Sequence, residues 1–231
     1  MKKVANGSAP GPSGWTGELL EAVLGDVDCL LEPIQFSFSR GGCERAVHLL
    51  QAALELDSTD SVLLSVDFSN AFNTLRRDVL LSRTFDEARL SPLWRLAHWA
   101  YKSPSDLLLS QAGDLVGVLS SAEGVRQGDV LSSFLFSFSV LPLYSAALSA
   151  APGVCGVAIM DDFELVGPAD RVLAAFDRVS ELASAYGLSL QRRKCALLWP
   201  RASPVPVPVS EGCSSRSLSV VRERAFLFSC P

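Results

Sequence analysis

The chain has 231 residues, of which 48% are hydrophobic and 19% are charged, with 20 Lys and Arg residues against 25 Asp and Glu residues. This length predicts one or two domains with a sizeable core, and the composition excludes a disordered, collagenous or coiled-coil chain. The net charge of −5 is unusual for a protein that binds nucleic acid, because phosphate binding favours a basic surface.

The cysteines are scattered, and no two of them have the C-x-x-C spacing of a metal or redox pair. Since only two histidines accompany them, a zinc module is not expected. No apolar run follows the basic start at Met1–Lys3, so a signal peptide is not expected either. We therefore expect reduced thiols, no disulfide-linked partner and an intracellular location, nuclear or cytoplasmic rather than secreted.

The first half of the chain predicts helices around one buried strand. Helices with apolar residues at helical spacing are expected at Trp15–Leu24 (capped near Ser13 and Gly14), Gly42–Leu56, Leu75–Phe85 and Pro92–Tyr101. Ser61–Asp67 (SVLLSVD) is a short Val- and Leu-rich run, which is typical of a central strand. Two apolar runs, Leu107–Ser110 and Leu115–Ser120, flank a turn sequence and predict a hairpin.

An uncharged stretch follows at Leu131–Met160, long enough to span a bilayer. Serines, prolines and glycines interrupt it, so a buried helix at Leu131–Leu148, broken or bent near Pro142, is favoured over a membrane span. The alternative of a membrane protein stays open at this stage.

The last third predicts strands around one more helix. Strands are expected at Val154–Met160 and Phe163–Val166, joined at Asp161-Asp162, and at Leu188–Leu190 and Ala196–Trp199. The amphipathic helix Asp170–Tyr186 should end at Gly187, and Arg201–Ser219 has the composition of a linker. These elements together predict an α+β fold, an antiparallel sheet with helices packed on one face.

Two acidic sites stand out because apolar sequence surrounds them. Asp67 ends the predicted central strand, and Asp161 and Asp162 lie between two apolar strands. A carboxylate at the rim of a buried strand is costly unless cations or donors compensate it, and adjacent acids repel each other. Divalent ions such as Mg²⁺ remove both penalties, and two ions about 3.5–4 Å apart would suit phosphoryl transfer. A capping aspartate and an exposed turn are the simpler interpretations of the same residues.

The order of the motifs resembles that of the reverse transcriptases. Asp67–Phe72 (DFSNAF) is similar to motif A of that family, Gly124–Asp129 (GVRQGD) to motif B and Met160–Asp162 to the motif C hairpin. Gly187–Leu190, followed by Lys194 and Cys195, is similar to motif D. Upstream segments similar to those of non-LTR retrotransposon polymerases are Gly11–Trp15, Gln35-Phe36 and Gly42–Glu44.

The resemblance implies a polymerase palm that transfers nucleotides with two Mg²⁺ ions, Mn²⁺ being possible in their place. It implies metal ligation by Asp67, Asp161, Asp162 and the Phe68 carbonyl, with Lys194 as a proton donor to pyrophosphate. It also implies the partners, which are an RNA or DNA template with its primer and dNTP, and no membrane.

Nucleotide contacts are implied for Phe68 and for four further residues, which are Phe72, Arg126, Gln127 and Gly128. Phe72 matches the aromatic under the incoming sugar, with core packing as the alternative. Arg126 could meet a phosphate or be an ordinary solvated arginine, and Lys194 could equally be a surface lysine.

The sequence also departs from the family pattern. Only Glu18–Ile34, which has no Lys or Arg, stands where the family has a basic fingers segment, and Ile159 replaces the motif C tyrosine. The expected organisation is therefore an N-terminal lead and remnant before the fingers (1–34), a palm (35–200) and a Pro/Ser-rich tail with a truncated start of the next motif (201–231). Fingers and thumb would be largely missing. The expected function is a truncated or degenerate RNA-directed DNA polymerase, with a catalytically inactive palm-fold interaction module as the alternative.

Overall fold

A computed structural model of the chain describes residues 14–25, 28–31, 33–56, 61–199 and 219–221. The predicted lead before residue 14, the Asp57–Asp60 turn and nearly all of the predicted tail lie outside these residues. Two compact units share the chain, and each is formed from two segments. Unit 1 comprises Met1–Val27 and Asn70–Ser139, and unit 2 comprises Asp28–Ser69 and Val140–Pro231.

Unit 2 is built on a five-stranded sheet with the order β4-β5-β1-β6-β7. Its strands are β1 (Ser61–Val66), β4 (Cys155–Ile159), β5 (Asp162–Pro168), β6 (Ala196–Leu198) and β7 (Ser219–Val221). Neighbouring strands are antiparallel except for β6 and β7, which are parallel. β1 is the central strand, as its apolar run predicts, because both of its faces are buried.

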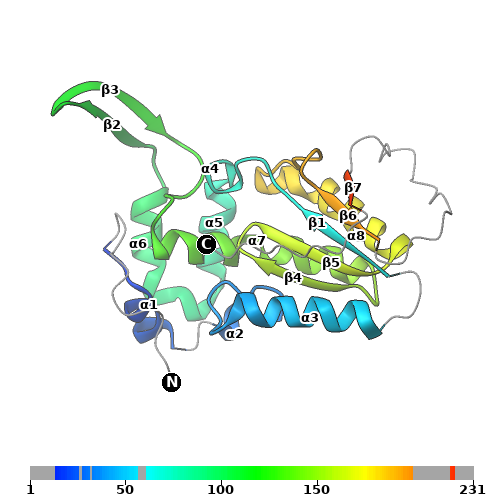
Figure 1. The fold of residues 1–231 in the computed structure, drawn as a ribbon. Coiled ribbons are helices and arrows are strands. Elements are labelled where there is room, and N and C mark those ends of the chain that lie inside the picture. The colour runs from blue at the N-terminus through cyan, green and yellow to red at the C-terminus, as the bar shows by residue number, and fades with distance from the viewer. Residues whose placement is uncertain (1–13, 26–27, 32, 57–60, 200–218, 222–231) are drawn as a thin grey trace. The chain divides into compact units, whose positions relative to one another are not determined.

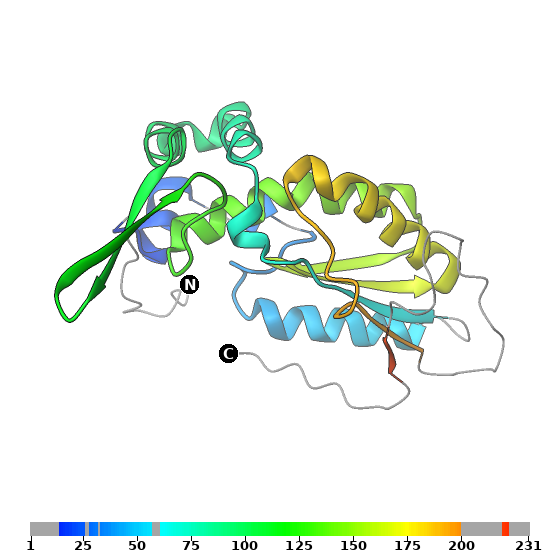
Figure 2. The same cartoon turned by 90° about the horizontal axis from the view of Figure 1, so that it is seen from above.

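Helices cover both faces of this sheet, where the sequence predicted one (Figure 2). α3 (Gly42–Leu56), whose bounds match the prediction, packs Ala46 and Leu50 against Leu63, Val157 and Val166 of the strands. α8 (Ala169–Ala183) contributes an apolar face that includes the fully buried Phe176. The short helix α2 (Asp28–Leu31) was not predicted. The α+β architecture itself is confirmed.

The chain after α8 behaves as predicted up to Gly187. The 3-10 helix η2 (Ser184–Tyr186) continues α8 and ends at Gly187, whose φ of 77° is the left-handed conformation that favours glycine. The strand predicted at Leu188–Leu190 is wrong, because among these residues only Leu190 pairs, in an isolated bridge with Phe68.

α7 (Val130–Ala150) is the uncharged helix of the sequence; its residues up to Ser139 belong to unit 1 and the rest to unit 2. The predicted break at Pro142 does not occur, since the helix continues through that residue. Among the described helices, α7 alone is long and apolar enough to cross a membrane, and 67% of its most apolar stretch is buried. Such burial is typical of a core helix of a folded domain.

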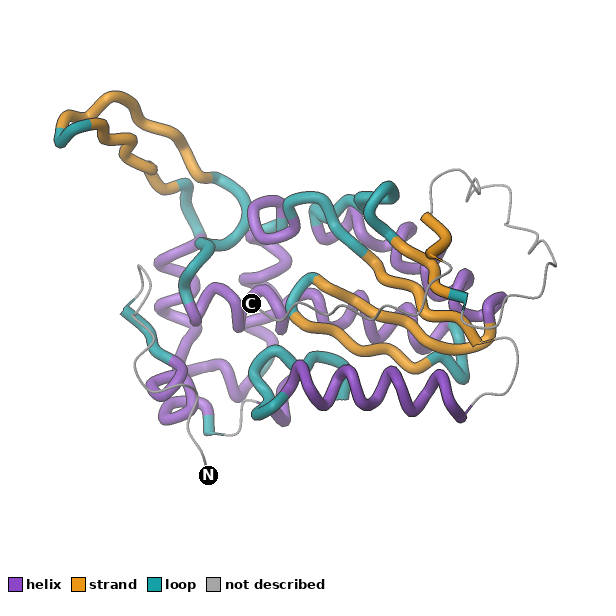
Figure 3. Tube along the Cα trace, in the orientation of Figure 1, coloured by secondary structure: helices purple, strands orange, loops and turns teal. Residues whose placement is uncertain are grey.

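Unit 1 is helical apart from one hairpin (Figure 3). Its helices are α1 (Gly17–Leu24), α4 (Ala71–Thr74), α5 (Arg77–Asp86), the 3-10 helix η1 (Ala88–Leu90) and α6 (Ser91–Tyr101). The hairpin is formed by β2 (Ser105–Gln111) and β3 (Asp114–Ser121), close to the predicted runs. The predicted cap of α1 is wrong, because Thr16 Oγ1 accepts the bond from Leu19 N at 3.3 Å.

A buried arginine fastens the segment after the hairpin to α5. Arg77 Nε donates to Gly124 O at 2.9 Å, and its two terminal nitrogens donate to Ser121 O at 2.8 Å and Glu123 O at 3.1 Å. Gly124 and Val125 also donate their N–H groups to Leu75 O and Phe72 O, at 2.9 and 2.7 Å. The segment from Ser121 to Val125 is therefore held against α4 and α5.

The tight docking of Gly124 yields the first prediction. Its φ is 65°, and a Cβ atom there would lie 2.4 Å from Asn73 Cα and from Phe72 O, both backbone atoms. We expect Gly124→Ala to lower the free energy of unfolding by at least about 3 kcal/mol, through strain and overpacking together. Chemical denaturation with the linear extrapolation measures it.

Gly128→Ala is the matched control, because Gly128 has a φ of 78° but nothing within 4 Å of an added Cβ. It should cost only the backbone term of about 1 kcal/mol. Equal losses in the two variants would contradict the close approach of Gly124 to α4.

Candidate active site

Asp67 directly follows β1 at the end where β5 begins, since the two strands are antiparallel. A turn from residue 191 to 195 holds its backbone: Gln191 N donates to Asp67 O at 2.9 Å, and Asp67 N donates to the buried Cys195 Sγ at 3.4 Å. Its carboxylate Oδ1 is buried and has no hydrogen-bond partner among the described residues. Such an oxygen is costly unless a further ligand satisfies it.

The second acidic site lies in the turn between β4 and β5. Met160 and Asp161 form the two-residue loop, and Asp162 is already the first residue of β5, paired with Ile159. The predicted joint at Asp161-Asp162 is therefore shifted by one residue. Met160 has a φ of 57°, and positive φ at the first loop residue is common to the favoured two-residue hairpin turns. This register separates the two acids, one in the loop and one on the strand.

The charges of the three carboxylates act on one another. Burial raises the pKa of Asp161, and the charges of Asp162 and Asp67 raise it further. Although Asp162 is exposed overall, partial desolvation and the Asp67 charge raise its pKa also. Both effects disfavour the ionised forms. The β1–β5 register places Asp67, Asp161 and Asp162 at the same end of the sheet, and their role as one common site stays a prediction.

The residues fit a divalent cation by their chemistry. The unsatisfied Asp67 Oδ1 and the mutual repulsion of the acids are both relieved by a hard cation bound to carboxylate oxygens. Within the described part of the chain, however, no three His, Cys, Asp or Glu side chains stand in a ready metal-binding group. The ligand set predicted from the sequence therefore stays a prediction.

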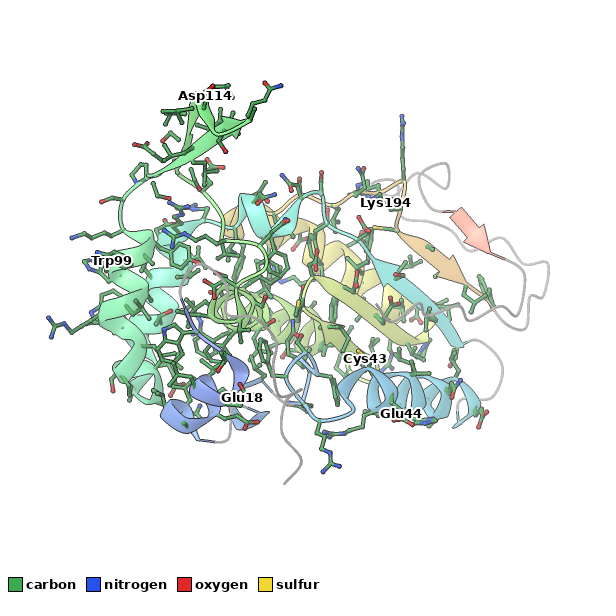
Figure 4. All side chains as sticks on the ribbon, turned by 60° about the vertical axis from the view of Figure 1, so that its left-hand side comes forward. Glu18, Cys43, Glu44, Trp99, Asp114 and Lys194 are labelled. Carbon is green, nitrogen blue, oxygen red and sulfur yellow. The ribbon has the colours of Figure 1, made fainter. Side chains whose placement is uncertain are left out.

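Phe68 and Lys194 take different positions beside Asp67. Phe68 pairs with Leu190 through its two neighbours: Asp67 O accepts from Gln191 N, and Ser69 N donates to Ser189 O. The Phe68 carbonyl therefore takes no part in the hydrogen bonds of this bridge. The Phe68 ring is buried, 6.4 Å from the ring of Tyr144. Lys194 is exposed on the turn that holds Asp67, before β6 (Figure 4).

Apart from Phe68, which lies in unit 2, the predicted nucleotide contacts lie in unit 1 and form one group. Phe72, in α4, is half-buried and stacks on Phe136 with ring centroids 4.3 Å apart. Arg126 lies with its guanidinium 5.9 Å from the Tyr101 ring centroid, while Gln127 and Gly128 are exposed. Because Val125 N bonds to Phe72 O, the loop and Phe72 are placed by one contact. Their roles toward a nucleotide stay predictions.

Sequence reasoning missed several residues that support this site. Gln35, Ser37 and Tyr144 hold the Met160 peptide, and Glu164 lies beside the acids on β5. Gln35 was noticed only as part of a family segment, and a buried glutamine cannot be recognised from one sequence. Glu164 carried a usable signal, which is a lone acid inside the apolar run FELVG.

Glu164 is half-buried, and its carboxyl has one partner. Ser65 Oγ donates to Glu164 Oε1 at 2.8 Å across the β1–β5 pair, and Oε2 has no partner among the described residues. Burial raises the pKa of Glu164 from 4.5 to about 7, and the Asp162 charge adds to this. Glu164 is therefore largely protonated at mildly acidic pH.

This raised pKa predicts a pH dependence of stability. Below the unfolded pKa the stabilisation from neutral Glu164 is complete, and it is lost as the pH rises through about 7. Between about pH 5 and pH 8, wild-type unfolding free energy should fall by about 2 kcal/mol more than that of Glu164→Gln. Urea unfolding across the pH series in EDTA measures it. Ser65→Ala, which removes the bond that lowers this pKa, should move the loss to higher pH; parallel curves would contradict the assignment.

The repulsion among the acids predicts a stabilising substitution. In EDTA, Asp161→Asn should raise the melting temperature by a few degrees, because it removes a charge that burial, Asp162 and Asp67 disfavour. Added Mg²⁺ should raise the melting temperature of the wild type and leave that of the variant nearly unchanged. Calorimetry with and without Mg²⁺ checks both statements.

Asp170→Asn is the control for this experiment, because Asp170 is exposed at the start of α8, beyond the opposite end of β5. It should keep the wild-type response to Mg²⁺. An Asp161→Asn variant that melts below the wild type in EDTA would show that the acids do not destabilise one another.

Comparisons with known proteins identify the family and the fold. The sequence matches the family described as reverse transcriptase (RNA-dependent DNA polymerase) over residues 17–217. A 132 kDa protein of the retrotransposable element SLACS from Trypanosoma brucei gambiense is 28% identical over 131 residues. That match covers 57% of this chain and 11% of the relative, so the chain spans about a tenth of the relative's length.

Solved structures of telomerase have a similar fold. Telomerase from Candida albicans, in complex with a fragment of telomeric RNA, has a TM-score of 0.59 at 14% identity, covering 83% of this chain and 34% of that one. Apo telomerase from Candida tropicalis has a TM-score of 0.60 at 13% identity, covering 80% and 41%. At such identities the likeness concerns the fold alone. Since the family match extends over most of the sequence, the chain belongs to the reverse transcriptase (RNA-dependent DNA polymerase) family and has its α+β, palm-like fold.

Proposed function

We propose that this chain carries the catalytic palm of an RNA-directed DNA polymerase, which transfers a nucleotide from dNTP to a primer 3′-hydroxyl. The single observation that supports this most is that Asp67, Asp161 and Asp162 lie at one end of the sheet, where burial and, after it, the charges of neighbouring acids raise the pKa values of Asp161 and Asp162. A fold alone does not carry an activity, but a set of mutually repelling carboxylates at family motif positions needs a cationic ligand.

Mg²⁺ is the ion that this donor set would hold. Asp67 and Asp161 would be the principal ligands, with Asp162 and the Phe68 carbonyl assisting. When bound, a pair of such ions activates the attacking hydroxyl and stabilises the leaving pyrophosphate. Asp67 Oδ1, which has no hydrogen-bond partner among the described residues, and the Phe68 carbonyl, which takes no part in the pairing with Leu190, would be available as metal ligands.

Side chains of the protein would supply the proton transfer and the contacts with the nucleotide. Lys194 is exposed on the turn whose Gln191 and Cys195 hold the Asp67 backbone, so the two side chains share one support. In that position Lys194 would give a proton to the departing pyrophosphate. Phe72, Arg126, Gln127 and Gly128 would contact the nucleotide, where the exposed Gly128 lets backbone approach the ligand.

The template contact is expected to be weak. Glu18–Ile34 contains no Lys or Arg, and the chain has a net charge of −5, so few phosphate contacts are available. The template with its primer and dNTP are proposed partners, and binding should fall steeply with salt.

Primer extension tests the proposal. The purified chain is incubated with poly(rA), an oligo(dT) primer and dTTP at low salt, with Mg²⁺ or Mn²⁺. We expect template-dependent incorporation that falls at least about a hundredfold in Asp67→Asn and in Asp161→Asn, because each change removes a charged ligand. Asp170→Asn, which should incorporate as the wild type does, is the control for the loss of an acid away from the site.

A catalytically inactive interaction module is the second candidate, and one observation favours it. The β2–β3 hairpin, with Asp114 at its tip, exposes large apolar side chains on both strands (Figure 4). These are Leu107, Leu108, Leu109, Leu115, Val116, Val118 and Leu119. If the wild type and Asp161→Asn give the same incorporation, or none, the polymerase proposal fails and this candidate takes its place.

A further inference from the structure

One peptide at the candidate site is held in an unfavourable conformation. Met160, the first residue of the β4–β5 loop, has a φ of 57°, which costs a residue with a Cβ atom about 1–2 kcal/mol. The next residue is Asp161, whose charge is repelled by Asp162 and Asp67. The repulsion favours movement of the loop away from Asp67, and the conformation of Met160 adds a further cost, so other interactions must hold the loop.

The side chain of Gln35 bonds to both polar groups of Met160. Gln35 Nε2 donates to Met160 O at 2.6 Å, and Met160 N donates to Gln35 Oε1 at 3.0 Å. A primary amide is suited to this task because it presents a donor and an acceptor side by side. Ser37 Oγ donates to Gln35 Oε1 at 2.5 Å and accepts from Met160 N at 2.6 Å.

Gln35 is itself held in place, because it is buried and its neighbours in the chain are hydrogen-bonded to β4. Gln35 is fully buried, and the chain on either side of it pairs with Ala158 of β4: Phe36 N donates to Ala158 O at 2.9 Å, and Ala158 N donates to Ile34 O at 2.8 Å. From α7, the buried Tyr144 donates its hydroxyl to Met160 O at 3.3 Å. Hydrogen bonds are stronger in such surroundings, and leaving one partner unpaired is correspondingly costly.

We propose that Gln35 is a positioning residue for the candidate active site, because it clamps Met160 in the left-handed conformation that keeps Asp161 beside Asp67. The inference rests on the proposed function, because the position of Asp161 beside Asp67 matters only if the two acids bind a cation. Gln35 touches neither substrate nor metal in this role, and it acts through the Met160 peptide. Without the clamp, the loop would relax and the acids would bind a cation more weakly.

Gln35→Glu tests the clamp through its own chemistry. A neutral carboxyl can donate to Met160 O and accept from Met160 N, whereas an ionised one can only accept and would face the carbonyl oxygen. The titratable groups that face this peptide are Tyr144 from α7 and Asp161 from the loop, and Arg45 of α3 lies over the neighbouring Phe36 ring. The introduced carboxyl should therefore preserve the clamp near pH 6 and lose it near pH 8.

Two measurements on the full chain follow this change. The affinity for Mn²⁺ is measured by electron paramagnetic resonance. It is compared with that of the wild type at each pH, so that the effect of pH on the charge of the aspartates is the same in both proteins. Gln35→Glu should bind Mn²⁺ about tenfold more weakly than wild type near pH 8 and equally well near pH 6. Gln35→Leu should be weaker at both, and Gln51→Glu, on the exposed face of α3, should match the wild type. Amide hydrogen exchange at Met160 should be faster wherever the affinity is lower.

The outcomes separate the clamp from the proposed function. Wild-type affinity and wild-type exchange in Gln35→Leu would overturn the clamp, as would a Gln35→Glu defect of equal size at both pH values. If the wild type itself binds no Mn²⁺, the proposed function fails, and the positioning role of Gln35 fails with it. This holds even if hydrogen exchange shows that Gln35 is bonded to Met160. If Asp67→Asn lowers affinity while Gln35→Leu does not, the polymerase site stands and Gln35 has no part in it.

Discussion

The burial of acids at one end of the sheet, with repulsion by neighbouring charges added to it, is the constraint on which the rest of this site depends. Asp67, Asp161 and Asp162 come from two separate stretches of chain. The ionised forms of Asp161 and Asp162 would have a lower free energy in water, away from the other acids. The antiparallel pairing of β1 with β5 brings the end of one strand to the start of the other, so the sheet itself enforces the encounter. The energy for this comes from the apolar core on both faces of the sheet, since charge opposes it.

Two side chains oppose the repulsion locally, and they do so in the same way. Gln35 bonds to both the N–H and the C=O of Met160, and the Cys195 sulfur accepts from the Asp67 N–H while its thiol lies 3.7 Å from the Asp67 carbonyl. Each therefore holds a backbone unit next to an acid without bonding to the carboxylate oxygens of that acid. This is what a cation site requires, because ligand oxygens that are already hydrogen-bonded are less available.

The sequence predicts the larger elements of this fold well and its local geometry less well. α3, β1 and α8 carry a clear period or an unbroken apolar run, so burial alone specifies them. The β4–β5 turn was placed one residue late, because the left-handed conformation of Met160 depends on Gln35, far away in the chain. The carboxylates could be found because acids among apolar residues are conspicuous, while Gln35 and Tyr144 could not, since their function exists only through contacts.

The acidic net charge, which seemed at odds with a nucleic-acid partner, has part of its explanation in this geometry. The site concentrates carboxylates where burial makes them costly, and Glu164 adds a further acid with a pKa of about 7 in the adjacent strand position. Strain at Met160, the unpartnered Asp67 Oδ1 and the half-buried Glu164 all lower stability in the absence of a ligand. Positive charge at the end of the sheet would reduce the two of these costs that involve carboxyl groups. The same groups that make the unliganded chain less stable therefore define which ligand it should bind, and a cation, more than the surface charge of the protein, would provide the contact with phosphate.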